Sequence, residues 1–225
     1  MMPAVAATPA AIVQQLRADE RGLATAASAA AFARFARERQ LTLRWLGRHP
    51  EIGAAVMKRA PNERDDIQAR IDLQKLTDAT PPLETRPRIG AAAPEASLRA
   101  WYTEAQRRFG IRWQLLAAIN LVESGFGRVR NTSVAGAQGP MQFEPGTWRA
   151  YGLGGDVHDP HDAILGAANY LRANGGRTDE RRALLHYNHS RLYVDAVLRY
   201  THRIAGVRTA FAEYYAWRVF VRVAG

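Results

Sequence analysis

Hydrophobic residues recur along most of this chain at intervals of three to four positions, which is the spacing of an amphipathic helix. Between residues 11 and 78, alanine, leucine and arginine follow this period throughout. Pro50 and Asn62 stand where helices would begin, as a first-turn proline and a capping side chain. The pattern predicts helices at about 10–25, 28–47, 50–59 and 62–77, and no combination of residues within them indicates chemistry.

The helical pattern stops at residues 79–96, where four prolines occur among few large apolar side chains. This composition is typical of a linker, so we place a domain boundary there. Helical periodicity returns beyond it. We therefore expect four parts: a helical N-terminal extension at 1–78, a proline-rich linker at 79–96, a helical domain at 97–206 and an apolar tail that packs on this domain at 207–225.

Start and stop signals divide the second helical region further. Ser97 is expected to cap its first helix and Gly110 to end it, while Thr178 or Asp179 is expected to cap a later one. The aromatic and β-branched stretch 214–223 is compatible with a strand or with an apolar tail. The predicted fold is mainly α, with little or no β, and the helices of this region are expected at 97–109, 113–124, 145–151, 162–173, 179–188 and 191–204.

One acidic residue lies where a core residue is expected. At helical spacing Leu116, Ile119 or Asn120, and Glu123 share one face of the apolar helix 113–124. Burial disfavours a carboxylate, so Glu123 should hold its proton to higher pH than a free side chain and donate it near neutrality. A glycosidase acid must do this. The alternative is that Glu123, at the end of the helix, points to water and has no role.

Two later loops carry side chains suited to a sugar. Gly125 and Gly127 favour a sharp turn after the helix, which would bring the following loop back over the helix end. That loop ends in Met141-Gln-Phe143, an apolar, amide and aromatic set. A further predicted helix ends in a phenol and an amide, Tyr187 and Asn188.

The ordered set of Glu123-Ser124, Gly-Ala-Gln-Gly-Pro-Met-Gln at 136–142 and Tyr187-Asn188 resembles the soluble lytic transglycosylase (SLT) domain family of the lysozyme-like superfamily. The resemblance extends over about 97–206 and implies a lysozyme-like helical domain that acts on peptidoglycan. The chain departs from the family pattern in two places. Pro140 replaces the usual leucine before Met141, and His189-Ser190 replace small residues after Asn188.

The resemblance implies a lytic transglycosylase with one catalytic residue and no cofactor or metal. Glu123 would protonate the glycosidic oxygen between N-acetylmuramic acid and N-acetylglucosamine and then deprotonate the muramoyl 6-hydroxyl, giving a 1,6-anhydro end. The substrate-binding residues that it implies are Ser124, Gln138, Met141, Gln142, Phe143, Tyr187 and Asn188. The alternatives are a hydrolytic muramidase like goose lysozyme, with Glu144, Asp156 or Asp159 as second carboxylate, and a non-catalytic cell-wall-binding protein.

The charge of the chain indicates an anionic partner. The formal net charge is +10 and the isoelectric point is about 10.6, and only Lys58 and Lys75 among the basic residues are lysines. The basic residues are scattered and no nucleic-acid-binding motif accompanies them. Peptidoglycan strands and anionic wall polymers are therefore the expected partners, and nucleic acid is not.

The remaining composition bears on location and metal binding. Residues 1–11 lack the basic start of a signal peptide, so an extracellular or envelope location in a bacterium is inferred from the substrate alone. No run of about 18 apolar residues predicts a membrane span. Cysteine is absent, which excludes disulfides. The histidines and aspartates of 154–162 are expected to form a turn and a helix start, with Asp159 and Asp162, and not a metal site.

Overall fold

Helices account for nearly all the regular structure of the protein. The computed structural model describes residues 8–81, 87–133 and 135–220. Within these ranges the only β-type pairings are two isolated bridges, between Ile89 and Val129 and between Gln138 and Phe143. The mainly α fold is thus confirmed. The helices are α1 Pro9–Thr25, α2 Ala29–Arg48, α3 Pro50–Arg59, η1 Pro61–Glu63, α4 Arg64–Ala79, α5 Glu95–Phe109, α6 Trp113–Ser124, α7 Pro145–Tyr151, α8 Pro160–Ala173, α9 Glu180–Tyr187, α10 Arg191–Gly206 and α11 Ala210–Ala216.

Two helix starts differ from the sequence prediction. Asn62 does not cap α4, because a 3-10 turn at Pro61–Glu63 precedes the helix, which begins at Arg64. Ser97 lies inside α5, whose first residue is Glu95 and whose flanking residue is Pro94. At α4, Pro61 fixes φ near its helical value and starts the 3-10 turn before Asn62 is reached. At α5, Pro94 is the extended N-cap, with ψ 141°, and the helix begins at the next residue. Asp179, and not Thr178, caps α9, accepting a hydrogen bond from the Arg182 N–H at 2.9 Å.

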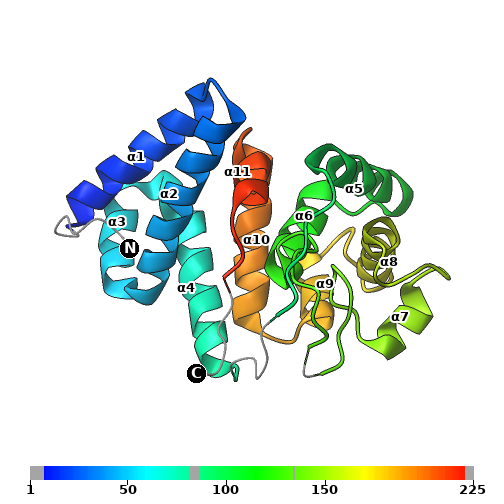
Figure 1. Cartoon of the computed structure of the whole chain (residues 1–225). Helices are drawn as coiled ribbons and strands as arrows, with labels where there is room; N and C mark the ends of the chain where they lie inside the picture. Colours follow the sequence, from blue (N-terminus) through cyan, green and yellow to red (C-terminus); the bar gives the residue numbers. More distant parts are fainter. Residues whose placement is uncertain (1–7, 82–86, 134, 221–225) are drawn as a thin grey trace.

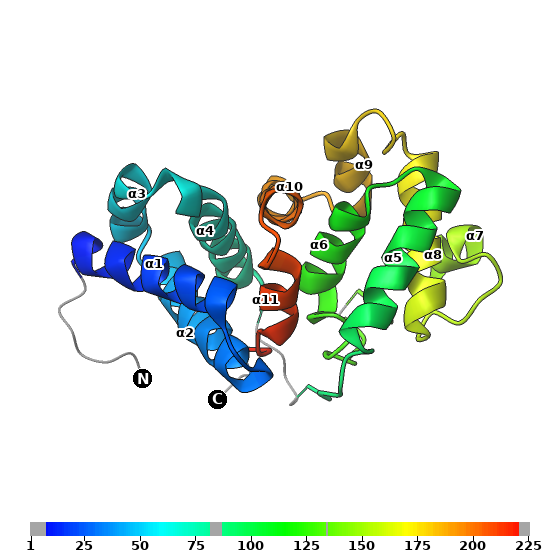
Figure 2. The same cartoon turned by 90° about the horizontal axis from the view of Figure 1, so that it is seen from above.

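The helices form two groups with α10 and α11 between them. Figure 1 and, from above, Figure 2 show α1 to α4 on one side and α5 to α9 on the other. Helix α10 packs against α4 on one face and against α6 on the other. Buried apolar residues from the N-terminal helices, α6 and α10 belong to one hydrophobic core, among them Leu43, Ile67, Ile119 and Val197.

A buried ionic cluster also joins the N-terminal helices to α10 and α11. The guanidinium of Arg39 in α2 contacts Glu63 and Asp66, each at 2.6 Å, and Glu213 of α11 at 2.9 Å. All four side chains are fully buried. Arg203 of α10 adds an ion pair with Asp66 at 2.7 Å. The N-terminal helices are thus fastened to the end of the chain by charge as well as by apolar packing.

The stretch 214–223, for which the sequence left a strand or a tail open, begins in helix α11, which ends at Ala216, and residues 217–220 are irregular. Alanine-rich α11 buries Phe211 and Tyr214 at i and i+3, and the ring of Phe211 makes edge contacts with Trp113 and Phe126. Alanine is the best helix former, and its abundance before the β-branched residues explains the difference. Residues 221–223 of that stretch, like residues 82–86 of the predicted linker and residues 1–7, lie outside the described residues.

In the described part of the chain, no helix combines the length and the apolar character that crossing a membrane requires.

Candidate active site

The candidate acid Glu123 lies in the last turn of α6. This helix is buried along most of its length, and Leu116, Ile119 and Asn120 on the face of Glu123 are fully buried. Gly125 follows with φ +58° and closes the helix through its N–H, which donates to the Leu121 carbonyl at 3.1 Å. The left-handed conformation that glycine tolerates thus ends the helix directly after Glu123-Ser124.

The surroundings of Glu123 favour its protonated form. The side chain is half-buried, and its Oε1 accepts a hydrogen bond from the Tyr193 hydroxyl at 2.6 Å. Burial raises the pKa of Glu123 from 4.5 to about 7, although the Tyr193 hydrogen bond lowers it. A carboxyl group with this pKa is a proton donor at neutral pH and becomes a base once it has given the proton away.

Ser124 ties the helix end to the following loop. Its hydroxyl is buried and donates to the Pro140 carbonyl at 2.5 Å, and it accepts a hydrogen bond from the Gly127 N–H at 2.8 Å. Among the hydrogen bonds of the described chain, none joins the Ser124 hydroxyl to the Glu123 carboxyl. The structure therefore places Ser124 behind the site, where it holds the loop against α6.

The loop 136–143 is a tight turn closed by the bridge between Gln138 and Phe143, with both backbone hydrogen bonds at 2.9 Å. Met141 and Phe143 are buried, so their side chains pack in the core. Gln142 has φ +49°, and its amide Nε2 donates to the Gly139 carbonyl at 2.9 Å. The loop is thus closed by hydrogen bonds between its own residues.

Tyr187 reaches the same loop from α9. Its hydroxyl donates to the Met141 carbonyl at 2.7 Å, and its ring contacts that of Phe143 with centroids 5.9 Å apart. Burial first, and then the nearby charge of Glu123, raise the pKa of Tyr187 well above 10. The electrostatic interaction places Tyr187 close to Glu123, although Tyr187 does not hydrogen bond to the carboxyl.

Asn188 and Ser190 form a short turn between α9 and α10. The Asn188 side-chain oxygen accepts a hydrogen bond from the Ser190 N–H at 3.0 Å. Ser190 in turn caps α10, accepting from the Tyr193 N–H at 3.4 Å. The departure from the family pattern at this point therefore has a local reason, because the serine starts the helix that carries Tyr193.

Tyr193 contacts the candidate acid, and the sequence prediction did not include it among the site residues. The periodicity of 191–204 marked Val194 and Val197 as its buried positions and left the tyrosine unassigned. A signal was present, since Tyr193 is one turn before Val197 and therefore on the same face. A phenol on the buried face of a helix needs a hydrogen-bond partner, and here the partner is Glu123.

The loop carboxylates are used for local structure. Asp159 caps α8 and accepts from the N–H groups of His161 at 2.9 Å and Asp162 at 3.0 Å, so the predicted turn and helix start are confirmed. Asp156 accepts from the His158 N–H at 2.8 Å, and Glu144 is exposed. Among the described residues, no three histidines, aspartates or glutamates are grouped so as to hold a metal ion.

Comparison with known proteins gives one match. Residues 101–205 match the family model described as Transglycosylase SLT domain. The matched region begins in α5 and ends in α10, and it includes Glu123, the loop 136–143, Tyr187 and Tyr193. No curated protein and no solved structure matches the chain. The match is to the family that the sequence motifs indicated, and it covers a little under half of the chain.

Proposed function

We propose that the protein is a peptidoglycan lytic transglycosylase with Glu123 as its catalytic residue, on the premise that residues 101–205 match the transglycosylase SLT domain family. The observation that carries the proposal is the Glu123 carboxyl, half-buried at the end of α6 with a pKa of about 7. The expected substrates are glycan strands of the cell wall, and the expected location is the cell envelope or the extracellular space.

The proposed reaction uses the two protonation states of Glu123 in turn. The protonated carboxyl gives its proton to the glycosidic oxygen, and the bond from that oxygen to C1 of N-acetylmuramic acid breaks. The resulting carboxylate then removes the proton of the muramoyl 6-hydroxyl, whose oxygen bonds to C1. Glu123 is protonated again, N-acetylglucosamine leaves as the free alcohol, and no water is consumed. A pKa near neutrality suits a group that must act as acid and then as base.

The neighbours of Glu123 would hold the acid and the loop in place. Tyr193 fixes the carboxyl through its hydrogen bond, and Tyr187 and Ser124 fix the loop through the carbonyls of Met141 and Pro140. Gln142 and Asn188 remain the proposed partners of the substrate's acetamido group, each through the amide atom that the local hydrogen bonds leave free. In this arrangement most of the predicted site residues hold the acid or the loop in position and do not contact the substrate.

Transglycosylation is favoured over hydrolysis because two of the three candidate loop carboxylates, Asp156 and Asp159, are engaged in local hydrogen bonds. Most glycosidases use a second carboxylate about 5 to 10 Å from the acid. Asp159 accepts two backbone N–H groups as a helix cap, and Asp156 accepts one. A carboxylate committed to capping is a poor candidate for activating water.

Mass spectrometry of the muropeptides released from purified peptidoglycan tests the proposal. We expect products ending in 1,6-anhydromuramic acid from the wild-type protein and none from the Glu123→Gln variant. Reducing ends would indicate a muramidase instead. The absence of any product, from a protein whose folding is verified by circular dichroism, would indicate a non-catalytic wall-binding protein.

A further inference from the structure

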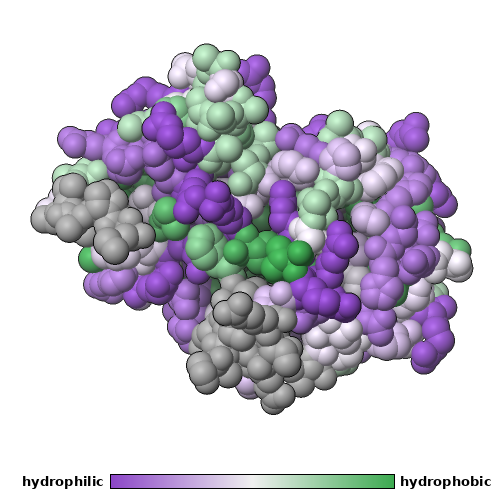
Figure 3. All heavy atoms as spheres, viewed as in Figure 1, coloured by the Kyte–Doolittle hydropathy of each residue, from purple (hydrophilic) through white to green (hydrophobic). Residues whose placement is uncertain are grey.

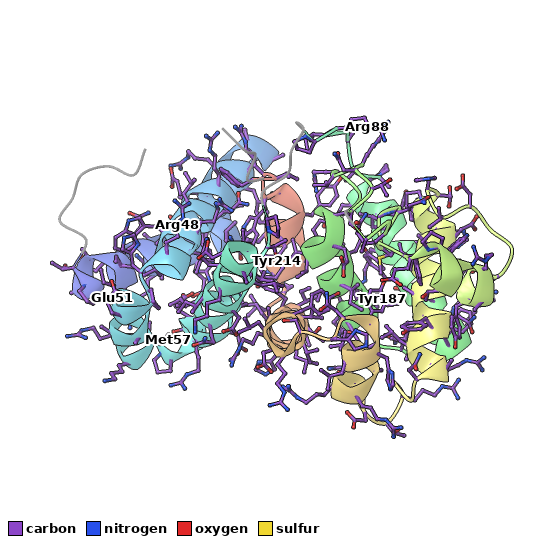
Figure 4. The ribbon with its side chains drawn as sticks, turned by 90° about the horizontal axis from the view of Figure 1, so that it is seen from below. Arg48, Glu51, Met57, Arg88, Tyr187 and Tyr214 are labelled. Carbon is purple, nitrogen blue, oxygen red and sulfur yellow. The ribbon has the colours of Figure 1, made fainter. Side chains whose placement is uncertain are left out.

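Glu123 lies on the wall of a cavity between the two groups of helices. The cavity has a volume of about 590 Å³. The end of α6 forms one wall, and α2 and α4 of the N-terminal helices form the wall opposite. In Figure 2 the N-terminal helices and α6 lie on either side of α10 and α11. In the view of Figure 4, Tyr214, which lines the cavity, lies between Arg48 of α2 and Tyr187 of α9.

The cavity wall is strongly basic. Its lining includes five arginines, and Glu123 is the one acidic residue in it among the residues that the structure describes. Arg44 and Arg48 are one turn apart on α2, and Arg70 faces them from α4. In Figure 3 strongly hydrophilic residues flank an apolar strip at the centre of the molecule. The apolar part of the lining includes Phe220, over which the Arg44 guanidinium stacks at 3.9 Å.

These arginines differ from others on the same helices in having no acidic partner. Arg39 of α2 and Arg203 of α10 are each bonded to buried carboxylates. In the described part of the chain, no carboxylate lies within 4 Å of the guanidinium of Arg44, Arg48 or Arg70. Burial, and then the repulsion of Arg70 and Arg48, lower the pKa of Arg44 to about 10. Like charges in one cavity destabilise the protein unless an anion joins them.

Two donors at the cavity also lack acceptors. The indole N–H of Trp217 and the Nε of Arg70 are buried, and neither makes a hydrogen bond within the described residues. Buried donors are normally satisfied, so two of them on one wall indicate a ligand with acceptor oxygens. The Gln40 side chain supports this wall, since its Nε2 donates to the Arg218 carbonyl at 2.7 Å and its Oε1 accepts from the Arg218 N–H at 3.0 Å.

We propose that this cavity binds the free carboxylates of the peptide stem carried by the muramoyl residue that is being cut. The inference rests on the proposed function. Guanidinium groups bind carboxylates through paired N–H donors, and the volume suits a few residues of peptide. Because Glu123 lines the cavity, a ligand held there lies next to the bond that Glu123 would break. The N-terminal helices would then form half of the substrate site and select strands with intact stems.

Kinetics on two substrates test the proposal. We expect the double variant Arg44→Gln/Arg70→Gln to raise KM for stem-bearing glycan strands at least tenfold. Its kcat/KM on strands stripped of their stems by an amidase should stay within twofold of wild type. The matched control is Arg107→Gln/Arg149→Gln, which removes two exposed charges from α5 and α7 and should change neither value. Equal losses on both substrates, or no loss on either, would overturn the proposal.

A binding measurement separates this inference from the proposed activity. Calorimetry with the inactive Glu123→Gln protein would compare a synthetic stem peptide bearing free carboxylates with the same peptide fully amidated. We expect the free acid to bind at least tenfold more tightly, and the preference to disappear when Arg44 and Arg70 are also replaced. Equal binding of acid and amide contradicts the inference even if anhydro products form. Should the glutamine variants fail to fold, Arg44→Lys/Arg70→Lys keeps the charge and should lose only part of the preference.

Discussion

At the scale of single residues, the candidate site depends on one carboxyl group, Glu123. Folding of the protein makes this group harder to ionise. The pKa of Glu123 is about 7 in the folded protein and 4.5 in its ordinary state. The folded state therefore binds more protons than the unfolded state between these two values. By linkage, the contribution of Glu123 to stability falls as the pH rises from about 4.5 to about 7. We therefore predict that the raised pKa of Glu123, which suits a proton donor, lowers the free energy of unfolding at neutral pH.

Replacing the carboxyl by an amide should reveal this cost. We expect Glu123→Gln to stabilise the protein at pH 8 by about 1–3 kcal/mol, because it removes a charge that folding buries. The gain should shrink to near zero at pH 4, where the carboxyl is protonated in both states. Thermal denaturation at a series of pH values measures it. Glu144→Gln, at an exposed glutamate, is the control and should show no such trend.

Tyr193 should set the alkaline limit of activity. Its hydrogen bond lowers the pKa of Glu123, so Tyr193→Phe should raise that pKa and move the alkaline fall of kcat/KM to a pH above that of the wild type. The measurement is the pH profile of kcat/KM on a soluble glycan. Tyr187→Phe, which loses only the hydrogen bond to the Met141 carbonyl, should leave the alkaline fall of kcat/KM at the pH of the wild type. If Tyr193→Phe lowers kcat/KM but its alkaline fall stays at the pH of the wild type, the role of Tyr193 is purely structural.

At the scale of elements, the turn that follows α6 depends on a glycine packed against a backbone. Gly139 has φ +73°, and a Cβ at this position would stand 1.9 Å from the Val157 carbonyl oxygen. Gly136 in the same loop has φ +85° but has nothing within 4 Å of its Cβ position. The two glycines therefore separate the effect of backbone conformation from that of close packing.

We predict different outcomes for alanine at these two glycines. Gly136→Ala should cost about 1–2 kcal/mol, the strain of a left-handed residue. Gly139→Ala adds a clash with backbone, so it should cost more and displace the carbonyls that Ser124 and Tyr187 bind. Urea denaturation and glycan turnover would measure both effects. Similar values for the two variants would mean that the loop shifts freely away from Val157.

At the scale of the whole molecule, the ionic cluster around Arg39 connects α2, α4, α10 and α11. Arg39 neutralises carboxylates that are fully buried, and the farthest of them along the chain, Glu213, is 174 positions from Arg39. Burial alone would raise the pKa of Asp66, but the guanidiniums of Arg203 and Arg39 hold it below 3.8. The SLT domain and the N-terminal helices thus share a charged core as well as an apolar one, which favours their unfolding together.

Breaking this cluster should be costly. Arg39→Met leaves buried carboxylates without their principal cation, and we expect it to lower the free energy of unfolding by about 3–5 kcal/mol. Arg37→Met, at an exposed position of the same helix, should change it by less than about 0.5 kcal/mol. Guanidinium or thermal denaturation followed by circular dichroism would measure the difference. A small effect of Arg39→Met would mean that Arg203 alone holds the cluster.

The amino-acid sequence alone indicated most of the helices, the resemblance to the SLT family and the candidate acid. Hydrophobic periodicity and the glycine and proline signals depend on residues that are close together in the sequence. The helices α3, α6 and α7 accordingly begin and end at the residues that the pattern predicted. The candidate acid could be predicted because Glu123 interrupts the apolar face of α6. Gly125 indicated where this helix ends. These features depend on neighbours within one or two turns.

Only the tertiary structure decided which side chains meet. Tyr193, 70 positions after Glu123, donates a hydrogen bond to its carboxyl, whereas the Tyr187 hydroxyl donates to the backbone carbonyl of Met141. The pairing of Arg39 and, among the described residues, the lack of an acidic partner for Arg44 and Arg70 also follow from how α2 packs on α4 and α11, which no local pattern encodes. Hydrogen bonds and charges act over a few ångströms in space, so their partners are fixed only when packing brings distant segments of the chain together.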